Sequence, residues 1–153
     1  MNSEQEKQVI EATQALKLRD VQLHDCRFER PTSVTAEQTN NARQENMRGV
    51  RFVIGDAEIE NRSVKILQVL VNLGIRVVAD VSEPEPPVYF VIEAEFMVEY
   101  EITGNLDEQA VVTFANFNGV HNAWPFWRQH VYDIVQRARL PHLDIALYGG
   151  VKS

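Results

Sequence analysis

The sequence predicts an α+β domain in which four antiparallel strands are followed by two helices that cover the apolar face of the sheet. Two observations support this class. Residues 88–102 alternate between apolar positions and positions that include four glutamates, and a period of two over such a length is typical of a strand with one buried face. Helical spacing of apolar residues begins only after Gly104 and ends at Pro141.

The N-terminal part of the chain predicts one peripheral segment and one strand. Residues 3–17 are rich in Glu, Gln and Lys, which predicts a weak amphipathic helix or a frayed tail over residues 1–14. The next segment alternates Cys26 and Phe28 with charged residues and stops at Pro31, as a strand does. Because Cys26 takes a core position in this pattern, we expect a buried and inert thiol.

The middle of the chain predicts a long connection and two further strands. Residues 32–47 are polar and weakly periodic, which predicts a connection over the surface, and loops of this length are often functional. A strand with an irregularity at Gly55 is expected over residues 50–60. Residues 63–81 predict either one long strand that bends at Gly74 or two shorter strands.

The helical region is expected to contain two separate helices. Residues 107–119 predict a short helix that ends near Gly119. Asn122 is suited to cap the second helix, and Pro125 then falls within its first turn. The apolar stripe of this second helix has five members: Trp127, Val131, Ile134, Val135 and Ala138. We therefore expect a single domain over residues 1–153.

Composition excludes several classes of function. The net charge of −7 and the lack of a basic cluster argue against a surface for nucleic acid or anionic membranes. The single cysteine rules out an internal disulfide and favours a reducing compartment. No segment is apolar and long enough for a signal peptide or a membrane span. The protein is expected to be cytoplasmic, without direct membrane insertion.

No arrangement of residues predicts catalysis. The four histidines, at positions 24, 121, 130 and 142, do not occur at spacings that place two ligands on one helix face. The cysteine has no neighbouring base in the sequence, and Gly149–Gly150 precedes no phosphate-binding helix. We therefore expect a protein that is not an enzyme and that uses no cofactor or metal.

Aromatic residues cluster at the start of the second predicted helix. Trp124, Phe126 and Trp127 lie within four residues of one another. One helix stripe can bury only part of three large rings, so we expect at least one of them at the edge of a groove or at a subunit contact. The glutamates of residues 88–102 face away from the core and are expected to form a solvated acidic surface.

Three segments of the sequence resemble the SecB family of bacterial preprotein-export chaperones. In the family's late segment, a hydrophobic residue and a proline introduce an amphipathic helix, and a Pro-x-Leu-x-Leu pattern follows it. Here these features stand as Trp124 to Trp127 and as "LPHLDI", Leu140 to Ile145. In addition, "HDCRFERP" is similar to the family's first strand and "YFVIEAEFMVEYEI" to its fourth strand.

This resemblance implies a fold, an assembly and an activity. The implied fold is the one expected above, with a crossover connection after the first strand. Family members form homotetramers, as dimers of dimers, in which the first strands pair and the first helices pack between dimers. They hold unfolded preproteins in hydrophobic grooves without ATP and deliver them to the SecA motor. Groove binding of this kind is physically reasonable because backbone hydrogen bonds and apolar pockets capture extended chains without a fixed sequence.

The resemblance also implies two sites. The client-binding groove would lie beside the second helix and would include Trp124, Phe126, Trp127 and Tyr132, together with residues of the crossover. The SecA-docking acidic face would comprise Asp25, Glu29 and Glu93, which the alternation also places opposite the core.

The chain departs from the family pattern in four places, and two other functions therefore stay open. It ends at Ser153 without the family's C-terminal tail, and the crossover has no aromatic residue. The hydrophobic residue before the proline is Trp124, and Arg137–Ala138 replaces an Arg-Gly turn. These departures predict a divergent member. One alternative is a SecB-like chaperone that guards an antitoxin. The other, from a different class, is a non-enzymatic domain that binds a small apolar ligand in a closed cavity.

Overall fold

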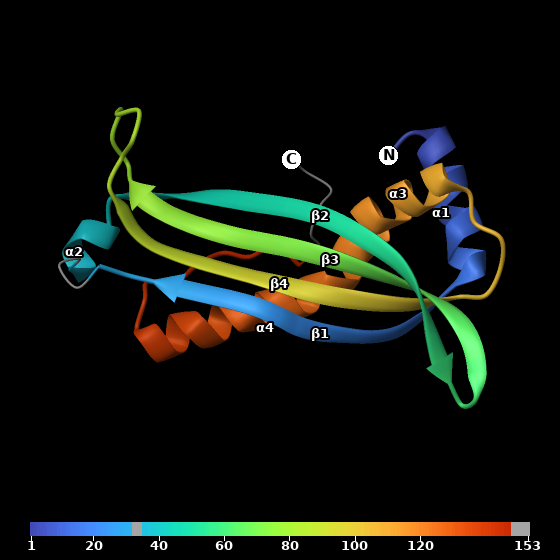
Figure 1. The fold of residues 1–153 in the computed structure, drawn as a ribbon. Helices are drawn as coiled ribbons and strands as arrows, with labels where there is room; N and C mark the ends of the chain where they lie inside the picture. The colour runs from blue at the N-terminus through green and yellow to red at the C-terminus, as the bar shows by residue number, and fades with distance from the viewer. Residues whose placement is uncertain (32–34, 148–153) are drawn as a thin grey trace.

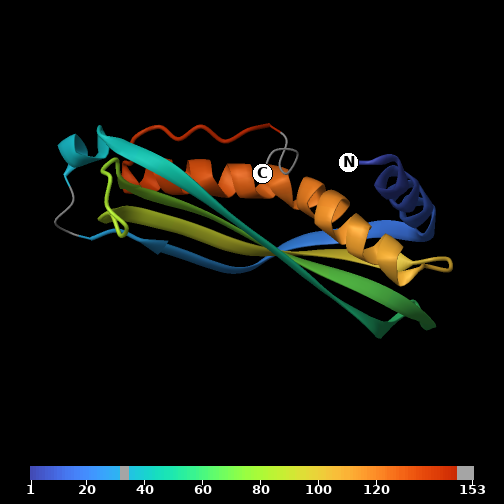
Figure 2. The same cartoon turned by 90° about the horizontal axis from the view of Figure 1, so that it is seen from above.

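A twisted sheet of four long strands forms one layer of the molecule, and helices form the other (Figures 1 and 2). The computed structural model describes residues 1–31 and 35–147. The strand order is β1-β4-β3-β2, and each neighbouring pair is antiparallel. The strands are β1 (Leu16–Glu29), β2 (Ala42–Ile59), β3 (Arg62–Ala79) and β4 (Val88–Ile102). The predicted class is therefore confirmed: an antiparallel sheet of four strands carries its helices on one face.

The core lies between the sheet and the helices, as the alternation predicts. Every second residue of β3 and β4 points toward the helices, and the register pairs Val69 with Val98 and Ile75 with Ile92 across the two strands. These side chains are at most 1% exposed. Of the two alternatives expected for residues 63–81, one long strand is observed, because β3 runs through Gly74 without interruption.

The first helix, α1 (Ser3–Ala15), packs on the helical layer at one end of the sheet. The Asn2 side chain accepts a hydrogen bond from the Gln5 N–H, and the Gln5 side chain accepts one from the Asn2 N–H. This reciprocal cap satisfies two N–H groups that a helix start leaves unpaired. Ala12 is fully buried, and Thr113 donates a hydrogen bond of 2.7 Å to the Gln8 side chain. These contacts place α1 against α3 (Glu108–Phe114).

The connection after β1 is shorter than predicted. It contains a short helix, α2 (Ala36–Thr39), and β2 begins at Ala42. The prediction of a loop over residues 32–47 is therefore wrong for residues 42–47, which belong to β2. The polar residues misled the prediction because β2 is an edge strand. Its backbone pairs with β3 along its whole length, while many of its side chains remain in water. Residues 32–34 lie outside the described residues.

The helical region does not break near Gly119, contrary to prediction. The segment α3 continues through a π-helical turn, Ala115–Gly119, into α4 (Val120–Ala138), and Gly119 has helical backbone angles. A side chain at Gly119 would place its Cβ 2.7 Å from Val69 Cγ1. Gly119 therefore permits a close approach of the helix to β3 instead of ending the helix. Pro125 lies inside α4.

Asn122 links α4 to the sheet and is not a helix cap. Its side-chain amide donates a hydrogen bond of 2.6 Å to the hydroxyl of Tyr100 on β4. Tyr100 is 2% exposed, and its burial raises the pKa of the hydroxyl to about 12.

The Tyr100→Phe variant tests this link. Removing the hydroxyl leaves the Asn122 amide without its acceptor, so the free energy of unfolding is expected to fall by about 1 kcal/mol. Urea denaturation measures this loss. Tyr89→Phe serves as the control because the half-buried Tyr89 forms no hydrogen bond through its hydroxyl within the described residues. Equal losses in the two variants would contradict the role of the Asn122 bond.

Candidate functional site

Helix α4 separates the four predicted groove residues onto three sides. Trp127 is 2% exposed and points toward the sheet with Val131, so its ring holds the helix to the core and does not reach the surface. Trp124 and Phe126 lie about 200° apart around the helix axis at about 100° per residue. They therefore face opposite flanks of α4 and do not form one wall.

The flank that carries Trp124 also carries Arg128 and Tyr132, at steps of four residues. The Arg128 guanidinium lies 5.2 Å from the centroid of the Tyr132 ring. The Trp124 indole N–H donates a hydrogen bond of 2.7 Å to the carbonyl of Ala146, and Arg128 Nε donates one of 3.1 Å to the carbonyl of Ile145. This flank is thus covered by the segment that follows α4.

The opposite flank faces β1 and is more open. Phe126 is 49% exposed and lies one turn from His130, whose ring contacts Phe96 of β4 edge-on, with centroids 6.4 Å apart. Phe96 pairs with Leu23 of β1, which is 51% exposed. Cys26 is also exposed. The expectation of a buried thiol is wrong because β1 is an edge strand that α4 covers only in part.

His130 makes the stability of this region sensitive to pH. Its half-buried ring stacks on Trp127, with ring centroids 6.3 Å apart. The pKa of the imidazole is lowered, mainly by burial; the charge of Asp133 raises this pKa and the charge of Arg137 lowers it further. The unfolded chain therefore binds a proton more readily than the folded one near the ordinary His pKa of about 6.5.

The folded protein should consequently lose stability as the pH falls below about 6.5, the unfolded pKa of His. Stability is retained above this pH because the ring is neutral in both states. Unfolding in urea between pH 8 and pH 5 measures the slope, and His130→Gln is expected to reduce it. The matched control is His142→Gln, because the side chain of His142 is 77% exposed. An identical slope in His130→Gln and the wild type would contradict this assignment.

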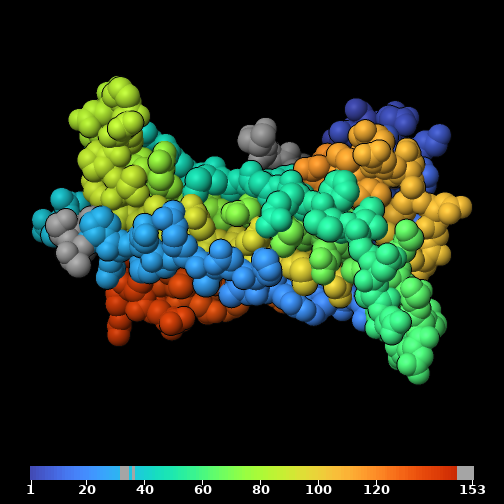
Figure 3. All heavy atoms as spheres, viewed as in Figure 1, coloured from blue at the N-terminus to red at the C-terminus, as the bar shows by residue number. Residues whose placement is uncertain are grey.

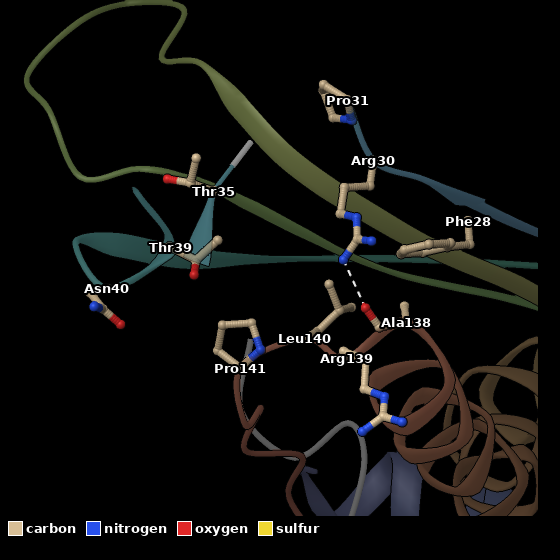
Figure 4. Close-up of a pocket in the computed structure, with 10 residues that line it drawn as sticks. All are labelled: Phe28, Arg30, Pro31, Thr35, Thr39, Asn40, Ala138, Arg139, Leu140 and Pro141. Carbon is tan, nitrogen blue, oxygen red and sulfur yellow. Dashed lines mark hydrogen bonds between the residues drawn. The ribbon is translucent and has the colours of Figure 1, made fainter. Parts of the chain in front are cut away.

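An open hollow of about 960 Å³ lies at the end of the sheet where β1, α2 and the end of α4 meet (Figure 4). Arg30 spans one side of it and donates a hydrogen bond of 2.8 Å to the carbonyl of Ala138. Arg139 ends α4 in a left-handed conformation with φ 56°. The hollow has five apolar and five polar lining residues: Phe28, Pro31, Ala138, Leu140 and Pro141, and Arg30, Thr35, Thr39, Asn40 and Arg139.

A second hollow of about 560 Å³ shares one wall with the first. Phe28, Arg30 and Pro31 line both hollows, and the second is completed by Glu29 of β1 and by Val88 and Val91 of β4. The end of β1 therefore stands between two neighbouring depressions. Apolar side chains beside polar groups form a lining that suits an extended peptide.

The predicted docking residues Asp25, Glu29 and Glu93 lie on the face of the sheet opposite the helices, which Figure 3 shows. Glu93 is paired there: Arg27 of β1 donates to it through Nε at 3.2 Å and approaches it through Nη2 at 3.1 Å. Arg27 also pairs with Glu29 at 3.0 Å, and these acids raise the pKa of its guanidinium. Asp25 is exposed and forms no ion pair within the described residues.

The remaining glutamates of β4 are paired in the same way. Glu95 lies between His24 of β1, at 3.1 Å, and Arg51 of β2, at 3.0 Å. The hydrogen bond from His24 is the main cause that lowers the pKa of Glu95. Arg19 lies 3.6 Å from both Glu99 and Glu101. The expected acidic surface is therefore a row of carboxylates between cations of the neighbouring strands, and its charge is largely cancelled.

The described residues contain neither a metal-binding cluster nor a helix suited to span a membrane. Within them, no three His, Cys, Asp or Glu side chains come together as a metal site would require. No helix in the same ranges combines the length and apolar character of a membrane span.

Sequence reasoning missed two features of this region. Arg30, Thr35 and Thr39 of the main hollow belong to the crossover, whose position depends on the fold, so no local sequence pattern identifies them. The contacts of Trp124 and Arg128 with the segment after α4 were also missed. A signal was present: Leu143 and Ile145 alternate with polar residues in "LPHLDIAL", Leu140 to Leu147, as in an extended segment with one buried side.

Comparison with known proteins supports the fold. No protein-family model and no curated protein match the chain. Among solved structures, it is similar to the SecB-like chaperone Rv1957 of Mycobacterium tuberculosis, determined in complex with a ChAD peptide from the Rv1956 HigA1 antitoxin. The TM-score is 0.65 at 14% sequence identity, over 94% of this chain and 97% of that one. The chain therefore has the fold of a SecB-like chaperone, as the resemblance in its sequence implied.

Proposed function

We propose that the protein is an ATP-independent chaperone that holds non-native polypeptides and is not an enzyme. The observation that carries this proposal is the open hollow between the crossover and the end of α4, on a fold shared with a peptide-binding chaperone. Its apolar wall suits side chains of an unfolded client, while its two arginines can donate to the client's backbone carbonyls. The space under α4 is filled by Trp127 and Val131, so no observation favours a closed ligand cavity.

We further propose that the chain assembles as a homotetramer in the cytoplasm. The free edge of β1 carries Leu18 and Leu23, which are 47% and 51% exposed. Pairing of two β1 edges would satisfy their unpaired backbone groups and cover these side chains. Light scattering coupled to size-exclusion chromatography gives the mass of the assembly, and a monomer at micromolar concentration would contradict this proposal.

Two client roles fit this activity, export of preproteins and protection of an antitoxin. The peptide in the similar Rv1957 structure comes from an antitoxin. The pairing of Glu93 with Arg27 weakens the acidic face that SecA docking would use. Both observations favour protection of an antitoxin over delivery to SecA.

The direct test is suppression of aggregation. A chemically denatured model protein is diluted into buffer with stoichiometric amounts of the chaperone and without nucleotide, and light scattering is followed. Suppression that is unchanged by added ATP is expected. Aggregation at the same rate as with an equal amount of serum albumin would overturn the proposal.

Charge reversal at Glu93 separates the two roles. Protection of an antitoxin requires no SecA contact at this face, so Glu93→Lys is expected to leave the affinity for SecA unchanged within about twofold. A tenfold change would correspond to about 1.4 kcal/mol. Surface plasmon resonance with immobilised SecA measures the affinity. Asp25→Lys is the matched variant, since Asp25 carries the uncompensated charge of the same face. A tenfold loss in Glu93→Lys would restore the docking face and the export role.

A further inference from the structure

The segment after α4 is extended and returns along the helix. Residues 140–147 contain no helix or strand, and Figure 2 shows this red segment running back beside α4. Its side chains alternate: Leu143 and Ile145 are 7% and 8% exposed, whereas His142, Asp144 and Ala146 are exposed. One side of the segment thus packs into the molecule, and the other faces water.

Side chains of α4, not a ladder of backbone bonds, hold this segment. Trp124 and Arg128 donate to the successive carbonyls of Ala146 and Ile145. The Leu140 N–H bonds to the carbonyl of Val135 at the helix end. Beyond Leu140, no backbone-to-backbone hydrogen bond fixes the segment within the described part of the chain.

These contacts are independent of the occupant's sequence, apart from two apolar positions. Carbonyl groups occur in every polypeptide. The indole N–H and the guanidinium could therefore donate to the backbone of any extended chain bound in this register. The two pockets filled by Leu143 and Ile145 require only apolar side chains two residues apart. The arrangement is therefore that of a bound extended peptide, supplied here by the chain itself.

The segment also adjoins the main hollow. Leu140 and Pro141 line that hollow, and the following residues pass along Trp124 and Arg128. A polypeptide that enters the hollow meets the start of the segment first. Release of the segment would extend the hollow into a longer groove along α4.

We propose that the flank of α4 bearing Trp124 and Arg128 is a groove for extended polypeptides with apolar residues at alternate positions, and that residues 140–147 are its resident occupant, which a client displaces. This inference rests on the proposed chaperone function and adds the mode of recognition. The resident segment keeps the groove covered when no client is present, which limits exposure of apolar surface.

Hydroxyl-radical footprinting read by mass spectrometry tests the displacement on the full-length protein. The probe is a reduced and carboxymethylated protein that remains unfolded. Its binding is expected to increase oxidation of the Leu143 and Ile145 side chains, which are 7% and 8% exposed, and to reduce oxidation of Phe28 and Leu140. Oxidation of Leu143 and Ile145 that stays unchanged while the client is bound would overturn the inference and leave the proposed function standing. A wild-type protein that binds no client would overturn both.

Variants of the occupant provide a second measurement. Ile145→Ser weakens the resident segment but leaves the groove intact, so it is expected to raise the affinity for the unfolded probe about five- to thirty-fold. Asp144→Ser is the matched control, because the Asp144 side chain is 98% exposed. A purely structural segment predicts the opposite result, with lower stability of Ile145→Ser and an equal or weaker affinity for the probe.

Discussion

Replacing Trp127 with alanine is expected to lower the free energy of unfolding by about 3–5 kcal/mol, the range observed when a large buried ring is removed. Trp127 is among the largest fully buried side chains of the described residues. Its ring lies under α4 and stacks on His130 at an angle of 29°. Truncation therefore leaves a cavity between the helix and β4 that neighbouring side chains fill only in part.

Urea denaturation followed by circular dichroism measures this loss. Phe126→Ala is a matched control because Phe126 is the preceding residue of the same helix and is 49% exposed. Its loss is expected to stay below about 1 kcal/mol, as for most surface substitutions. Equal losses in the two variants would contradict the assignment of Trp127 to the core.

Replacing Phe28 with glutamate is expected to lower the affinity for an unfolded client about tenfold or more, which corresponds to about 1.4 kcal/mol. Phe28 forms the wall shared by the two hollows. A carboxylate there must be desolvated when an apolar client side chain covers it, and this desolvation opposes binding. The suppression of aggregation should fall in proportion.

Fluorescence anisotropy of a labelled unfolded protein measures the affinity. Val53→Glu is the control, since Val53 is 51% exposed on β2 and lines neither hollow. Thermal melts of both variants verify that they remain folded. A Phe28→Glu variant that is folded and binds the client as tightly as Val53→Glu does would remove the hollow from the proposed function.

The sheet could be predicted from the sequence largely because its central strands are buried on one side. β4 was expected over residues 88–102 and is observed over Val88–Ile102, since strict alternation reports a half-buried strand directly. The start of β2 could not be predicted in the same way. As an edge strand, β2 leaves its side chains in water, and its backbone pairing with β3 is invisible in the polar sequence 42–49.

The candidate site was less predictable because its contacts join distant segments. Asn122 is a residue type that often caps helices, and Gly119 is one that often ends them. Their roles are instead decided by tertiary contacts, of Asn122 with Tyr100 and of Gly119 with Val69. Likewise, the acidic row of β4 was evident in the sequence, but its neutralisation depends on the register with β1. That register places Arg27 opposite Glu93, which alternation within one strand does not reveal.

Site-specific photo-crosslinking most directly tests whether the hollow holds unfolded polypeptides. A photoreactive amino acid replaces Leu140 at the wall of the hollow, and in a matched protein it replaces Gln22 on the opposite face of the sheet. Irradiation with an unfolded model protein is expected to yield crosslinks from position 140 and few from position 22, and the native form of the same protein should yield none. Equal crosslinking from both positions, or none from position 140, would contradict a client-binding site in the hollow.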